Sequence, residues 1–99
     1  MTVRRTQKLF FYRDDSLVIE LVEPSTAGFL WSLQLDRGIQ LFSERYKNAD
    51  AVGIGSFPTK LVALTCGTPG IYKVVASLRR PWMKDAPPEE EVEYTIEVL

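Results

Sequence analysis

The alternation of apolar and polar residues near the C-terminal end of the chain restricts its fold most strongly. Val92, Tyr94, Ile96 and Val98 are separated by glutamates and one threonine. Successive side chains of a β-strand point to opposite faces, so this spacing produces one apolar face and one polar face. The segment 92–98 is therefore predicted to be a strand that packs on a core with one face and meets water with the other.

The same period of two recurs along the rest of the chain, interrupted by turn-forming residues. Many short alternating runs separated by turns are typical of β-sandwiches. The candidate strands are 9–12, 17–22, 29–35, 39–46, 57–64, 72–78 and 92–98. The length of 99 residues allows one domain, and we expect it to cover 1–99. A helix is an open alternative for 39–46, where the alternation is poor.

The first strands and the two ends of the chain carry further local signals. The polar turn at 13–16 predicts a hairpin between 9–12 and 17–22. Basic residues gather within 4–13, and acidic residues gather within 89–97. If these two segments form neighbouring strands, their opposite charges face each other across the sheet.

The overall charge and the hydropathy pattern argue against several classes of partner. The chain has 12 basic and 13 acidic residues, whereas a nucleic-acid-binding protein usually carries a basic excess on one face. No run approaches the ~18 apolar residues of a membrane helix. We therefore expect the chain to bind neither nucleic acid nor a membrane. The apolar run at 9–12 is shorter than the ~7–15 residues of a signal peptide. As it reads, the chain is expected to be cytoplasmic; removal of a signal peptide would make it periplasmic or secreted.

The chain lacks the residues that most catalytic and metal sites use. Cys66 is the only cysteine and there is no histidine, so an intrachain disulfide, a zinc site and a Cys–His nucleophile are excluded. We expect no enzyme activity, no cofactor and no metal. Two alternatives stay open, which are calcium binding by acidic residues such as Asp14 and Asp15, and a carboxylate pair of the glycosidase type.

Three connecting segments are unusual for plain turns. The segment 24–31 joins two strands through small residues and ends with Phe29 and Trp31, 52–57 contains two glycines, and 79–84 places Trp82 behind a proline. The first segment leaves the second predicted strand, the second leaves the fourth and the third leaves the sixth. Loops of a sandwich alternate between its two ends, so these three are expected to cluster at one end.

Each of these segments also has a purely structural interpretation. Trp31 shares a face with Phe29 and is expected to pack between the sheets. Trp82 either projects as a binding residue or folds back over a sheet edge. The glycines Gly53 and Gly55 are explained equally well by a β-bulge.

Taken together, the three segments resemble the signature loops of the chagasin family of cysteine-peptidase inhibitors. The first family pattern, Asn-Pro-Thr-Thr-Gly-Tyr/Phe-x-Trp, is matched at Thr26, Gly28, Phe29 and Trp31. The second, Gly-x-Gly-Gly, is matched by the glycines of 53–56, and the third, Arg-Pro-Trp/Phe, is matched completely by residues 80–82. The order and spacing are also similar, and the resemblance covers nearly the whole chain.

The resemblance implies an immunoglobulin-like antiparallel β-sandwich of about seven to eight strands. It also implies a monomeric, reversible inhibitor that occludes the active-site cleft of a papain-like cysteine peptidase with three loops. The residues implied to bind the peptidase are Ser25, Thr26, Ala27, Gly28, Gly53, Gly55, Ser56, Arg80, Pro81 and Trp82. Pro24-Ser25, Ala27 and Ser56 depart from the family patterns. An altered first loop leaves open a non-inhibitory, immunoglobulin-like protein-interaction module that uses the same loop cluster.

Overall fold

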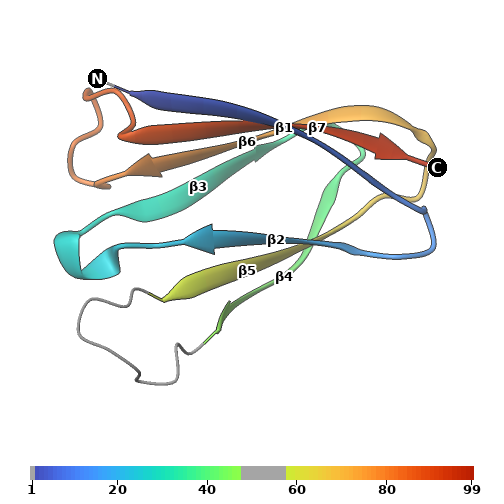
Figure 1. The fold of residues 1–99 in the computed structure, drawn as a ribbon, viewed down its shortest axis with the longest axis horizontal. Helices are drawn as coiled ribbons and strands as arrows, with labels where there is room; N and C mark the ends of the chain where they lie inside the picture. Colours follow the sequence, from blue (N-terminus) through green and yellow to red (C-terminus); the bar gives the residue numbers. More distant parts are fainter. Residues whose placement is uncertain (1, 48–57) are drawn as a thin grey trace.

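Two β-sheets face each other in the part of the chain that the structure, a computed structural model, describes (Figure 1). The described residues are 2–47 and 58–99. They form seven strands and one short 3₁₀ turn, η1, with the bounds β1 Val3–Phe11, β2 Leu17–Val22, η1 Ser25–Ala27, β3 Leu30–Leu35, β4 Gln40–Lys47, β5 Thr59–Thr65, β6 Gly70–Arg79 and β7 Glu90–Val98. No helix in the described residues is long and apolar enough to cross a membrane.

The strand order confirms the predicted sandwich and adds one parallel ladder. One sheet has the order β1-β7-β6-β3, and the other has the order β2-β5-β4. Strand pairs are antiparallel except for β1 and β7, which run parallel from Val3 opposite Glu90 to Phe11 opposite Val98. A parallel pair needs a long connection, and here nearly the whole domain separates the two strands.

The predicted hairpin between the first two strands is wrong, because β1 and β2 belong to different sheets. The intervening turn, in which the Asp15 amide donates to the Tyr12 carbonyl at 2.8 Å, carries the chain across the sandwich. β1 pairs with β7 instead, and two of its arginines meet glutamates of that strand. The Arg5–Glu90 ion pair and the register of Arg4 opposite Glu91 confirm the expected charge complementarity.

The segment with poor alternation is the strand β4, so the helix alternative is wrong. The register between β4 and β5 shifts between Leu41 and Ser43, which leaves Phe42 as an extra residue. A bulge of this kind places two residues opposite one and interrupts the period of two. The bulge explains why the sequence pattern was ambiguous at this position.

The core lies between the two sheets and is formed by the alternating positions. Val92, Tyr94, Ile96 and Val98 are buried on the inner face of β7, as predicted, and Trp31 is buried on β3. The glutamates between the β7 positions face outward, and one of them, Glu93, pairs with Lys73 at 3.1 Å.

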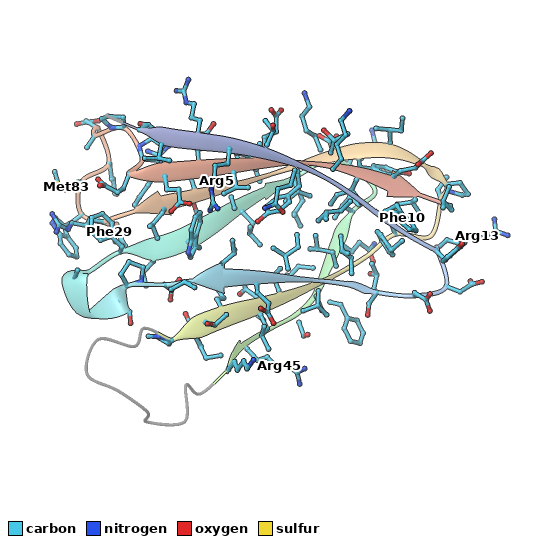
Figure 2. The ribbon with its side chains drawn as sticks, in the orientation of Figure 1. Arg5, Phe10, Arg13, Phe29, Arg45 and Met83 are labelled. Atoms are coloured by element: carbon cyan, nitrogen blue, oxygen red, sulfur yellow. The ribbon has the colours of Figure 1, made fainter. Side chains whose placement is uncertain are left out.

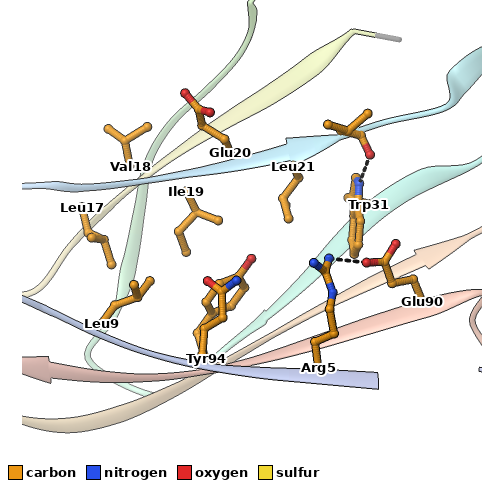
Figure 3. A pocket seen from close by; sticks show the side chains of 12 residues that line it. Arg5, Leu9, Leu17, Val18, Ile19, Glu20, Leu21, Trp31, Glu90 and Tyr94 are labelled. Carbon is orange, nitrogen blue, oxygen red and sulfur yellow. Dashed lines mark hydrogen bonds and ion pairs between the residues drawn. The ribbon is translucent and has the colours of Figure 1, made fainter. Parts of the chain in front are cut away.

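One side of the sandwich is open between the edge strands β1 and β2. Figure 3 shows a groove of about 340 Å³ there, with Trp31 and Tyr94 among its lining residues and the Arg5–Glu90 pair beside Trp31. The Trp31 Nε1–H donates to the Val22 carbonyl at 2.8 Å and so connects the two sheets across this opening. The groove follows the strand edges, and no residue of 24–29 or 79–84 lines it.

The inner face of β7 gives a stability prediction. Ile96 is completely buried, so Ile96→Ala should lower the free energy of unfolding by about 2–5 kcal/mol through lost burial and the cavity left behind. Ile71→Ala is the matched control, because Ile71 is 73% exposed and should change stability by no more than ~0.5 kcal/mol. Denaturant unfolding measures both; equal losses would contradict the proposed core.

Candidate functional site

The first loop is a tightly hydrogen-bonded turn. Pro24 has φ −76° and ψ 65°, the geometry of an inverse γ-turn, and the Ser25 amide donates to the Glu23 carbonyl at 2.8 Å. The 3₁₀ turn follows, with the Ala27 amide donating to the Pro24 carbonyl at 3.1 Å. Gly28 ends it in the left-handed region at φ 86°, which glycine adopts without steric cost. The backbone of this loop is therefore held by its own bonds.

Glu23, at the base of the first loop, is a completely buried carboxylate. One oxygen accepts the Trp31 backbone N–H at 2.9 Å, and the other accepts the Tyr46 hydroxyl at 2.6 Å. The Glu23 amide donates to the Pro58 carbonyl at 2.9 Å. Hydrogen bonds to a charged group contribute about 1.5–3 kcal/mol each, so this network holds the loop entry firmly between the sheets.

Sequence reasoning missed Glu23, although a signal was present. Ile19, Leu21 and Glu23 have the same strand parity, so an acidic residue stands where the pattern requires an inward side chain. Its hydrogen bond is the main reason that the pKa of Tyr46 is raised to about 12, with burial and the negative charge of Glu23 adding to the effect.

The third loop consists of two consecutive turns. The Met83 amide donates to the Arg80 carbonyl at 2.9 Å, with Pro81 at the position where its fixed φ favours a turn. The Ala86 amide then donates to the Met83 carbonyl at 3.2 Å, and the Arg79 guanidinium donates to the Ala86 carbonyl at 3.2 Å. These turns leave Trp82 68% exposed at the loop tip.

Direct contacts join the first and third loops. Arg80 Nε donates to the Ala27 carbonyl at 3.1 Å, and the guanidinium lies over the Phe29 ring, 4.4 Å from its centre. The Trp82 ring rests on Gly28 so closely that a Cβ there would overlap ring atom Cη2. Trp82 is thus both exposed and packed, and its packing partner is the first loop instead of a sheet edge.

The structure brings Ser25, Ala27 and Gly28 together with Arg80, Pro81 and Trp82 at one end of the sandwich (Figure 1). The backbone of Thr26 belongs to the same turn. The second predicted loop, with Gly53, Gly55 and Ser56, lies outside the described residues. The strands that flank it end beside the first loop, since Thr59 pairs with both Val22 and Lys47.

We call 24–29 and 79–84 the loop ridge, and its charge differs from that of the whole chain. The ridge contains Arg79, Arg80 and Lys84 but no acidic residue, whereas the chain has a net charge of −1. Its exposed apolar side chains include Trp82 and Met83. An exposed surface with aromatic, arginine and apolar side chains is suited to protein binding.

Cys66, the only cysteine, lies away from the loop ridge. It is buried after β5, and its thiol donates to the Thr68 carbonyl at 3.3 Å. Within 2–47 and 58–99, no three Cys, Asp or Glu side chains gather in a way that could hold a metal ion.

Comparison of the sequence with family profiles identifies one family. Residues 12–98 match the sequence profile of the Chagasin family peptidase inhibitor I42. No curated protein matches the chain by sequence.

Solved structures with a similar fold include one that is named a cysteine protease inhibitor. The cysteine protease inhibitor EhICP2 from Entamoeba histolytica has a TM-score of 0.78 at 16% identity, over 99% of this chain and 95% of that one. Amebosin has a TM-score of 0.69 at 21% identity, over 98% of each chain. PbICP-C, in complex with falcipain-2, has a TM-score of 0.67 at 17% identity, over 99% of this chain and 91% of that one. At these identities the likeness establishes the fold.

The buried carboxylate predicts an unusual tyrosine titration. Because the pKa of Tyr46 is about 12 in the folded protein and 10.0 ordinarily, the hydrogen bond stabilises the fold fully below pH 10. That contribution is lost as the pH rises through 12. In a spectroscopic titration of tyrosinate, Tyr46→Phe should remove a step near pH 12, and Glu23→Gln should move it towards 10. If the difference between the wild-type and Tyr46→Phe titrations instead shows a step near pH 10, the Tyr46–Glu23 hydrogen bond is contradicted.

The close approach of Trp82 to Gly28 predicts a strict requirement for glycine. Gly28→Ala should displace the ring and lower the free energy of unfolding by about 1 kcal/mol or more, because the added Cβ meets both the ring and an unfavourable φ. Gly67→Ala is the control, since a Cβ there meets nothing within 4 Å. Tryptophan fluorescence and denaturant unfolding should change in the first variant alone; an unchanged Gly28→Ala spectrum would contradict the contact.

Proposed function

Because this chain belongs to the chagasin family of peptidase inhibitors, we propose that it reversibly inhibits papain-like cysteine peptidases and catalyses no reaction itself. The observation that carries this proposal is the joining of the first and third loops into one surface through Arg80 and Trp82. A surface that is already ordered loses little conformational entropy when it binds.

In the proposed complex the first loop lies over the catalytic Cys–His pair, with Thr26 nearest the nucleophile. The 3₁₀ turn at Ser25–Ala27 supports this arrangement, because a turned backbone offers no extended, substrate-like strand for cleavage. The internal hydrogen bonds of the loop, together with Glu23 beneath it, would resist rearrangement into such a strand. The loop would therefore occupy the cleft and stay intact. Gly53 and Gly55 of the second loop would follow the non-primed side of the cleft.

Trp82 would contact the primed side of the cleft as the main apolar binding residue. Tryptophan and arginine are enriched among the residues that dominate binding energy. Gly28 and Arg80 would act as positioning residues for it, because they hold the ring and its loop against the first loop.

Partner identity follows from the relatives and is part of the proposal. EhICP2 is named a cysteine protease inhibitor, and PbICP-C was solved in complex with falcipain-2. We extend this class of partner to the present chain, and we propose that it acts as a monomer without nucleic acid or membrane.

Titration of papain with the purified protein tests the proposal. Wild type should inhibit, and Trp82→Ala should weaken binding by about 2 kcal/mol or more, roughly 30-fold, while denaturant unfolding still shows a cooperatively folded protein. Phe42→Ala is the matched control, because Phe42 is an exposed aromatic residue, 73% accessible, on β4 away from the loop ridge. It should inhibit like wild type.

Two outcomes would count against the proposal. Equal inhibition by wild type and Trp82→Ala would remove Trp82 from the mechanism. Absence of inhibition across a panel of papain-like peptidases would favour the non-inhibitory interaction module instead.

A further inference from the structure

A small hollow adjoins the third loop on the side of the β6–β7 connection. Its volume is about 220 Å³, and Phe29, Met83 and Ala86 contribute to its apolar wall. Figure 2 shows Phe29 and Met83 at the loop end of the molecule. The hollow is larger than the ~30 Å³ occupied by one water and smaller than the ~300–1,000 Å³ of drug-sized pockets, so its size suits a single side chain.

The hollow is held open by hydrogen bonds within the β6–β7 connection. The Arg79 guanidinium and the Met83 carbonyl bond Ala86 from both sides, at 3.2 Å each. The Glu89 amide donates to the Leu78 carbonyl at 2.9 Å, which fixes the far end of the connection to β6. A partner would therefore meet a formed depression and would not need to order the connection.

The charges around the hollow indicate what it can receive. Arg79 and Arg80 both line it, against a single carboxylate from Glu89. Arg80 also belongs to the interface between the first and third loops, so the hollow is continuous with the loop ridge. A carboxylate on a short methylene stem fits both the apolar wall and the positive charge of the hollow, because the stem packs on the wall and the oxygens reach a guanidinium.

We propose that this hollow binds an aspartate or glutamate side chain of the inhibited peptidase and so selects peptidases that carry an acidic residue facing the third loop. This inference rests on the proposed inhibitory function. Trp82 would then project into the peptidase, and the hollow would accept a side chain from it. Two such contacts distinguish one peptidase from another more sharply than either alone.

The role of charge in the hollow is tested by Glu89→Gln, which removes the negative charge of Glu89 from its lining. Association with a susceptible peptidase should become faster by about threefold at low ionic strength, and the gain should shrink as salt screens it. Glu97→Gln makes the same change in net charge on β7 at the opposite end of the molecule and should leave the association rate unchanged. Equal rates for the two variants would overturn the proposal.

The shape of the hollow is tested by Ala86→Phe, which fills it. Inhibition should weaken by about tenfold or more, while denaturant unfolding shows an intact fold. If wild type inhibits and Ala86→Phe inhibits equally strongly, the hollow has no role in binding, and the proposed inhibitory function stands. If wild type inhibits no papain-like peptidase, both proposals fail together.

Discussion

The buried carboxylate of Glu23 is the interaction on which the arrangement of the loop end depends. It follows β2 of one sheet and accepts a hydrogen bond from the backbone of Trp31 in the other, while Tyr46 of β4 satisfies its second oxygen. A buried charge is costly unless it is fully hydrogen-bonded, and this one has two strong donors. The first loop begins at the next residue, so its position relative to both sheets is determined where the chain leaves the core.

Close packing then links the first loop to the third. Gly28 combines a left-handed backbone with the absence of a Cβ, and both properties are needed where the Trp82 ring lies against it. Arg80 reinforces the same contact by bonding the Ala27 carbonyl and stacking on Phe29. The two loops support each other, so a flexible pair of connections becomes one surface while Trp82 stays largely exposed.

Much of this fold was predictable, because alternation reports directly which side chains face a core. The inner face of β7, the burial of Trp31 and the clustering of the first and third loops all followed from strand parity. Pairing partners did not, since the polar turn at 13–16 fits a hairpin and a crossing between sheets equally well. The extra residue at Phe42 shifts the register of the ladder and breaks the alternation of apolar and polar residues, so the strand β4 could not be recognised from its sequence pattern. The site residues were found as loop motifs, but their contacts depend on geometry across more than 50 residues of sequence separation, as for Arg80 and Ala27.

The parallel ladder between β1 and β7 has a practical consequence for handling the molecule. It brings the beginning of the chain to the loop end, where Thr2 and Val3 bond the carbonyls of Pro88 and Glu89. The last strand ends at the opposite pole, where Leu99 bonds Phe11 (Figure 1). A fusion partner or surface linker joined at Leu99 leaves the ridge free, whereas cargo attached ahead of Thr2 would project beside the third loop and obstruct whatever docks there.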